Sequence, residues 1–164
     1  MTLAPDFYRG EIAVEPDDAL RLVMQLERSK IALDVQGAID YLLAQPFVQP
    51  KKAGVVGFCF GGTVAGTFSY SGHDVGAVVS FYGSGFKVTE EIVGSIKVPL
   101  LAIYGEDDLG IPMEMVQENE RQLKQYNIPH EVISYPGAGH AFFNDTRPAY
   151  RPEAAADAFR RTLE

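Results

Sequence analysis

The segment GFCFGG, at residues 57–62, most strongly constrains what this chain can fold into. It joins Ala53–Phe58, an apolar run typical of a buried strand, to a helical pattern over Thr63–Ser71. A strand that turns into a helix within one residue strains the backbone there, so the residues two positions away must be small. The flanking glycines meet this condition, and Gly62 lets the helix approach the sheet. The segment therefore predicts a sharp corner with Cys59 at its tip.

A cysteine at such a tip has a possible catalytic role. Its thiol would lie at a helix N-terminus, where partial positive charge favours the thiolate. The backbone N–H of Phe60 would point at the oxyanion of a bound acyl group. Cys59 could equally be a small buried hydrophobe, the commonest fate of a lone cysteine. A dinucleotide-binding loop is excluded because Cys59 replaces the second glycine of GxGxxG.

The rest of the chain alternates apolar runs with amphipathic segments, which predicts an α/β fold with a mostly parallel sheet and helices on both faces. No linker-like stretch is visible, so a single domain is expected over residues 1–164. The carboxyl edge of such a sheet is where α/β proteins bind ligands. The expected strands are Ala53–Phe58, Gly76–Tyr82, Val98–Tyr104 and His130–Tyr135, and the expected helices are Asp17–Ser29, Ile31–Gln45, Thr63–Ser71, Met113–Tyr126 and Arg151–Leu163.

Two further motifs follow predicted strands. Three carboxylates at residues 106–108 stand in YGEDDLGIP; one could orient an imidazole, as the third member of a catalytic triad does, and the others are expected to be solvated. His140 stands in YPGAGHAFFND, on a glycine-rich loop. The other histidines, His73 in a turn and His130 at a strand start, are expected to be structural or exposed. The order Cys59, Asp108, His140 is the nucleophile–acid–histidine order of α/β hydrolases.

Composition narrows the possible partners. The net charge of −8 disfavours nucleic acid and anionic membranes. One cysteine allows no internal disulfide, and the start of the chain does not look like a signal peptide. No Cys/His pair has metal-ligand spacing, and no apolar run approaches the ~20 residues that span a bilayer. These features predict a soluble, cytoplasmic domain without a metal or other cofactor.

The motifs VVGFCFGG, YGEDDLGIP and YPGAGHAFFND together resemble the dienelactone hydrolase family of α/β hydrolases. The resemblance covers nearly the whole chain and implies Cys59 as nucleophile and His140 as general base. It selects Asp108 as the acid, three residues after Gly105 and four before Pro112. The implied reaction is acyl transfer, in which the thiolate attacks an ester or lactone carbonyl and water hydrolyses the thioester.

The chain departs from the family pattern in two ways. The family's first strands, with a second oxyanion donor and an acidic residue near the thiol, would precede APDFYRG, so the resemblance implies an N-terminally truncated domain. A substrate-binding arginine of the family falls at Asn144, which favours a neutral ester or lactone. Tyr82 and Phe142, with the side chain of Phe60, are candidates for an apolar pocket.

An incomplete sheet also suggests a function of another class. The chain could be a non-catalytic fragment, or an interaction protein whose sheet is completed by another polypeptide, with self-association through the exposed strand edge. A redox-sensing thiol at Cys59 is a third interpretation.

Overall fold

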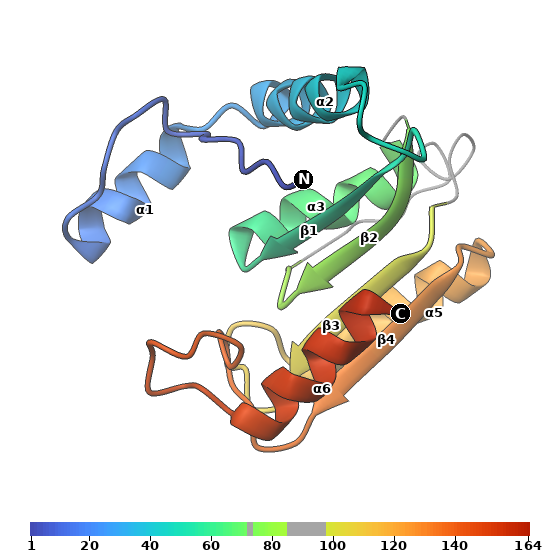
Figure 1. Cartoon of the computed structure of the whole chain (residues 1–164). Helices are drawn as coiled ribbons and strands as arrows, with labels where there is room; N and C mark the ends of the chain where they lie inside the picture. The colour runs from blue at the N-terminus through green and yellow to red at the C-terminus, as the bar shows by residue number, and fades with distance from the viewer. Residues whose placement is uncertain (72–73, 85–97) are drawn as a thin grey trace. The chain divides into compact units, whose positions relative to one another are not determined.

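The computed structural model describes residues 1–71, 74–84 and 98–164 (Figure 1). The chain forms two compact units, Met1–Ala53 and Gly54–Glu164, which are described separately. His73 lies outside the described residues.

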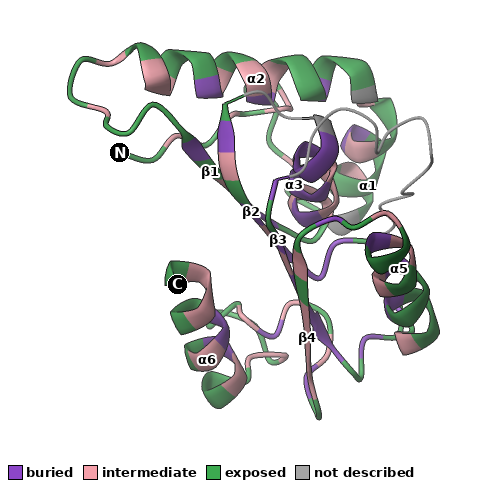
Figure 2. Ribbon diagram, turned by 90° about the vertical axis from the view of Figure 1, so that its right-hand side faces the viewer, coloured by how far each residue is buried: buried purple, intermediate pink, exposed green. Residues whose placement is uncertain are grey.

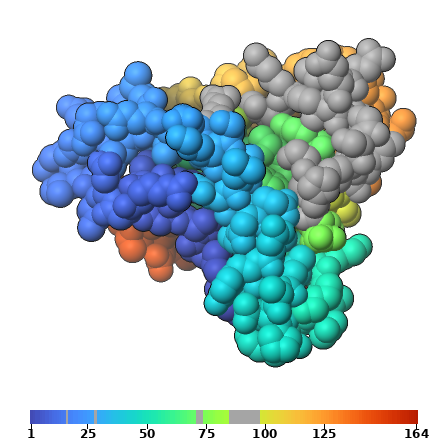
Figure 3. Space-filling view, turned by 90° about the horizontal axis from the view of Figure 1, so that it is seen from above, coloured from blue at the N-terminus to red at the C-terminus, as the bar shows by residue number. Residues whose placement is uncertain are grey.

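The first unit consists of two helices and the segments around them. Helix α1 spans Pro16–Gln25, and α2 spans Arg28–Ala44. Proline suits the first turn because its missing N–H would have no helical partner there. The carboxylate of Asp34 in α2 accepts two bonds from the Arg9 guanidinium at 2.8 Å. Figure 3 shows the surface of this unit, coloured blue to cyan.

The second unit is built on a four-stranded sheet in the order β1-β2-β3-β4, with its strands running in parallel (Figure 1). Each predicted strand is present with its boundaries shifted by two residues at most. β3 begins at Leu100 instead of Val98, because Pro99 has no N–H to contribute to a sheet ladder. The strands are β1 Ala53–Phe58, β2 Val75–Phe81, β3 Leu100–Gly105 and β4 His130–Tyr135.

Helices cover both faces of this sheet, as predicted. α3, Phe60–Ser71, and α5, Met113–Gln125, lie on one face, and α6, Pro152–Leu163, lies on the other (Figure 2). The hydroxyl of Tyr135 on β4 donates to Asp157 on α6 at 2.8 Å, which ties that helix to the sheet. The core between the layers is apolar and includes Val78, Leu100, Ala102, Ile103, Leu123 and Ala158.

The predicted strand–helix corner is present at Cys59. Its backbone φ is 55°, in the left-handed region that non-glycine residues rarely occupy. A Cβ on Gly57 would lie 1.9 Å from the carbonyl oxygen of Gly61, and one on Gly62 would lie 2.4 Å from that of Phe81. A Cβ on Gly61 would meet no atom within 4 Å, so alanine would also fit there, and the predicted need for a small residue is strict only at Gly57. The backbone of Gly61 leaves no room for a side chain at Gly57.

This difference predicts opposite effects for two alanine substitutions. Gly57→Ala forces a Cβ into backbone atoms and should lower the free energy of unfolding by about 1–3 kcal/mol, the usual cost of overpacking. Gly61→Ala adds a methyl group in open space within α3 and should leave stability unchanged or raise it by up to about 1 kcal/mol. Urea unfolding followed by circular dichroism measures both. Equal midpoints for the two variants would contradict the described packing.

Candidate active site

Cys59 lies at the tip of the corner between β1 and α3, where its free thiol is exposed. Its N–H donates to the carbonyl oxygen of Phe81 at 3.0 Å, and its own carbonyl oxygen accepts the N–H of Thr63 at 3.0 Å. The N–H of Phe60, the first residue of α3, has no acceptor within the part of the chain that the structure describes. An exposed thiol therefore stands beside an unpaired backbone donor at a helix N-terminus, an arrangement suited to oxyanion binding.

Asp108 is the only member of the acidic triplet whose side chain is buried, with 2% of it exposed. Its Oδ1 accepts the N–H groups of Gly110 at 2.9 Å and Ile111 at 3.2 Å, which turns the carboxylate inward. Glu106 and Asp107 are exposed, and Glu106 accepts the hydroxyl of Ser134 at 2.8 Å. The local turn thus separates one carboxylate from its two neighbours.

His140 meets that carboxylate. Its Nδ1 lies 2.7 Å from Oδ2 of Asp108, and 40% of its side chain is exposed. A carboxylate can only accept, so Nδ1 carries the proton and Nε2 is left free as a base. The two loops pack backbone to backbone, because the N–H of Asp107 donates to the carbonyl oxygen of Ala138 at 2.9 Å. A Cβ on Gly105 would lie 2.2 Å from that same oxygen, so only glycine fits there.

Tyr82 lies close to both Cys59 and His140. Its ring centroid is 5.0 Å from that of His140, and only 3% of the residue is exposed. Burial, with a smaller contribution from the negative charge of Cys59, raises the pKa of Tyr82 to about 12. Tyr82 is therefore neutral at physiological pH and does not serve as a base. Its φ of 38° is unusual for a bulky residue, and such strain clusters at functional sites.

The sequence did not correctly identify every aromatic residue around the site. Phe142, predicted to contact substrate, is 0% exposed and packs against Tyr82 at 5.7 Å and Tyr135 at 5.4 Å, so it supports the site from within. Phe58 was not predicted; it is 43% exposed and stacks on Phe81 at 4.7 Å and on Phe143 at 5.5 Å. Its place next to Cys59 in the sequence was the signal that could have identified it. The side chain of Phe60 is half-buried.

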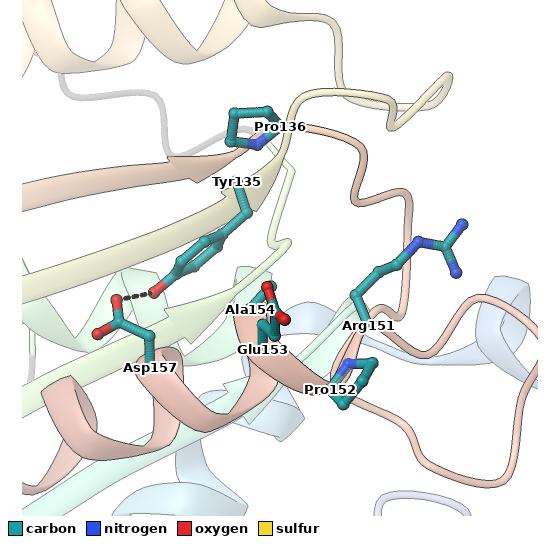
Figure 4. A pocket seen from close by; sticks show the side chains of 7 residues that line it. All are labelled: Tyr135, Pro136, Arg151, Pro152, Glu153, Ala154 and Asp157. Atoms are coloured by element: carbon teal, nitrogen blue, oxygen red, sulfur yellow. Dashed lines mark hydrogen bonds between the residues drawn. The ribbon is translucent and has the colours of Figure 1, made fainter.

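Two surface hollows formed by the described residues of this unit bear on the site. One, of about 490 Å³, is lined by residues 107–110 and His140, beside the acid–histidine pair. The other, of about 500 Å³, lies at the start of α6 (Figure 4). Its lining contains no histidine or cysteine, and the hydroxyl of Tyr135 points there at Asp157. The first hollow adjoins the acid–histidine pair but is not lined by Cys59, so it is a candidate for the part of the substrate site on the His140 side.

The described residues contain neither a metal-binding cluster nor a membrane-spanning helix. Across residues 1–71, 74–84 and 98–164, no three His, Cys, Asp or Glu side chains are grouped so that they could hold a metal ion. None of the helices in those ranges is long and apolar enough to cross a membrane.

Known proteins resemble this chain along its whole length. The model of the dienelactone hydrolase family matches residues 1–164. A "Putative carboxymethylenebutenolidase" of Synechocystis sp. is 34% identical over 173 residues, covering 98% of this chain and 68% of the relative. "Protein usf" of Aquifex pyrophilus is 33% identical over 168 residues, covering 99% of this chain and 72% of the relative.

Solved structures show the same fold. A crystal structure described as a "Putative Dienelactone Hydrolase" of Klebsiella pneumoniae superposes with a TM-score of 0.83 at 25% identity, covering 96% of this chain and 70% of that chain. An alpha/beta hydrolase enzyme from a deep-sea metagenome library superposes with a TM-score of 0.63 at 22% identity, covering 80% of this chain and 62% of that chain. The family match and the relatives show that this chain, with its α/β-hydrolase fold, belongs to the dienelactone hydrolase family.

Proposed function

We propose that this protein hydrolyses small carboxylic esters or lactones through a Cys59–His140–Asp108 triad and a thioester intermediate. The observation that carries the proposal is the 2.7 Å bond between Nδ1 of His140 and the buried carboxylate of Asp108. A histidine held in one tautomer by a buried acid, and a free thiol at a helix N-terminus, are the parts of an activated nucleophile, and Tyr82 lies near both of them.

The proposed reaction begins with proton transfer from the Cys59 thiol to Nε2 of His140. The thiolate attacks the ester carbonyl carbon, a C–S bond forms, and the N–H of Phe60 donates to the resulting oxyanion. When this tetrahedral intermediate collapses, the C–O bond breaks and His140 returns its proton to the departing alcohol. Water, deprotonated by His140, then attacks the thioester. The C–S bond of the second tetrahedral intermediate then breaks, the carboxylic acid leaves, and His140 returns its proton to the thiolate, which restores the thiol.

Replacing the nucleophile tests this chemistry directly. Cys59→Ala should reduce hydrolysis of p-nitrophenyl acetate by at least about 10³-fold, because no acyl-enzyme can form. In the unaltered protein, iodoacetamide should alkylate Cys59 and abolish the activity in parallel. Mass spectrometry after rapid quenching should detect the acetylated thiol. Full activity in Cys59→Ala would disprove the mechanism.

The acid can be tested with a matched neighbour. Asp108→Asn removes the carboxylate that holds the His140 tautomer and should lower kcat by about 10²–10⁴-fold. Glu106→Gln, on the same loop, keeps an oxygen that can accept the hydroxyl of Ser134 and should leave kcat near that of the unaltered protein. Steady-state kinetics compare the two variants. Equal losses of kcat in both variants would mean that catalysis depends on the structure of the loop and not on the Asp108 carboxylate.

The charge of the hollow beside His140 bears on the substrate. Asp107 lines the hollow and is exposed, and the five lining residues include no lysine or arginine. Asn144 stands where the family resemblance implies an arginine for the substrate carboxylate. An anionic ester would approach an unneutralised carboxylate, which costs about 1 kcal/mol at 4 Å in water. Neutral esters and lactones are therefore the favoured substrate class.

Reversing this charge should change the preference. Asp107→Lys should raise kcat/KM for an anionic ester, such as a monoaryl succinate, by roughly three- to ten-fold relative to the acetate of the same phenol. In high salt, the ratio of kcat/KM for the anionic ester to kcat/KM for the acetate should fall back towards its value in the unaltered protein, because exposed charges are screened. A ratio that Asp107→Lys leaves unchanged would place the substrate outside this hollow.

A non-catalytic interaction protein is the second candidate. β1 is the outermost strand of the described sheet, and its Val56 and Phe58 are 51% and 43% exposed. Such an edge can accept a strand from another chain or from a second copy. This candidate predicts no ester turnover in either the unaltered protein or Cys59→Ala, so the nucleophile experiment separates the two functions.

A further inference from the structure

The side chain of Ser80 has no role in the reaction described above, although it is a polar group in the core. The residue lies in β2 and is 0% exposed. Burying a hydroxyl is unfavourable unless it finds a hydrogen-bond partner. Ser80 donates to the carbonyl oxygen of Gly62 at 2.9 Å, in the first turn of α3. Its bond therefore joins the sheet to the turn that begins at the nucleophile corner.

From Gly62 a line of hydrogen bonds leads to Phe60. The peptide unit that contains the Gly62 carbonyl also contains the N–H of Thr63, which donates to the carbonyl oxygen of Cys59 at 3.0 Å. The peptide unit that contains the Cys59 carbonyl also contains the N–H of Phe60. Because peptide units are planar and trans, fixing the direction of each carbonyl fixes that of its N–H. Ser80 thus stands at one end of this line and the Phe60 N–H at the other.

Hydrogen bonds in such a line also strengthen one another. A donor to the carbonyl of a peptide unit polarises that unit and makes its N–H a better donor, by ~10–30% per bond. The effect passes from Ser80 through the Gly62–Thr63 unit to the Cys59–Phe60 unit. The last donor in the line is the Phe60 N–H, which would face the developing negative charge of the oxyanion. A stronger donor there lowers the activation barrier of the acyl transfer.

The surroundings leave little freedom for another arrangement. A Cβ on Gly83 would lie 2.5 Å from Oγ of Ser80, so the glycine is what makes room for the hydroxyl. The N–H of Ser84 donates to Oγ1 of Thr63 at 2.9 Å, a second tie between the end of β2 and the start of α3. The N–H of Cys59 is held by the carbonyl oxygen of Phe81 at 3.0 Å. The peptide units of the line are therefore anchored on both sides.

We infer that Ser80 is a positioning residue for the oxyanion site, aligning and polarising the Phe60 N–H through the Gly62–Thr63 and Cys59–Phe60 peptide units. This inference rests on the proposed acyl transfer at Cys59. The bond from Ser80 to Gly62 remains in place throughout the reaction, and its contribution is realised only when the oxyanion forms. Removing it should therefore change the catalytic step more than substrate binding.

The test compares two buried serines of the same unit. Ser80→Ala removes the end of the line and should lower kcat by roughly ten-fold with KM nearly unchanged. Ser69 is also 0% exposed and donates to a carbonyl of α3, that of Gly66 at 2.8 Å, in the second half of the helix. Ser69→Ala should cost comparable thermal stability and leave kcat unchanged. Ser80→Cys, which keeps a weak donor, should lose less activity than Ser80→Ala.

A spectroscopic measurement reports on the donor itself. The thioester formed from a slowly hydrolysed ester, labelled with ¹³C at its carbonyl, has a stretching frequency that falls as hydrogen bonding to its oxygen strengthens. Infrared difference spectra should show a higher frequency in Ser80→Ala than in the unaltered protein, and no shift in Ser69→Ala.

The outcomes distinguish the inference from the proposed function. If Cys59→Ala is inactive but Ser80→Ala keeps its kcat and carbonyl frequency, the inference fails and the proposed function stands. A fall in kcat that is equal in both serine variants, or a change confined to KM, also overturns the inference. If Cys59→Ala is fully active, the proposed function fails and the inference fails with it.

Discussion

The left-handed backbone at Cys59 is the constraint on which the rest of this site depends. A non-glycine residue in that conformation costs about 1–2 kcal/mol, and it persists only where its surroundings hold it. Two hydrogen bonds, to Phe81 and from Thr63, hold the residue in place. Because Gly57 and Gly62 have no side chains, β1, α3 and β2 can approach one another closely enough to form those bonds. The same turn exposes the thiol and leaves the first N–H of α3 without an acceptor among the described residues.

The register of the sheet brings the acid and the histidine together. Gly105 at the end of β3 pairs with Tyr135 at the end of β4, so the loops that follow them start at the same level. The N–H of Glu106 continues the ladder by donating to the carbonyl oxygen of Tyr135 at 3.1 Å. Residues far apart in sequence are thereby placed within hydrogen-bonding distance. The carboxyl edge of a parallel sheet collects side chains from successive loops in this way.

Sequence patterns predicted the strands and the corner well, because buried parallel strands and a one-residue strand–helix turn leave strong local signals. Spacing alone could not show that Gly57 lacks room for a Cβ while Gly61 has it, because the two glycines stand at equal distances from Cys59 in the sequence. Phe142 was misjudged because an aromatic residue near a catalytic histidine can face inward or outward, and only packing decides. Ser80 had no signal, since a serine in an apolar strand is equally consistent with an unexceptional core position. The family resemblance, rather than the spacing of charges alone, selected Asp108 from its neighbours.

The electrostatics of the site explain why the geometry of one backbone donor matters. The residues lining the hollow beside His140 contain two carboxylates and no lysine or arginine. Tyr82, close to the thiol, stays neutral at physiological pH because burial and the Cys59 charge raise its pKa. In the proposed reaction the oxyanion therefore depends on oriented dipoles, with the Phe60 N–H at the start of α3 as the donor that this chain supplies. A preorganised dipole stabilises charge only as well as it is aimed, so residues that aim it, although they never touch substrate, belong to the catalytic design.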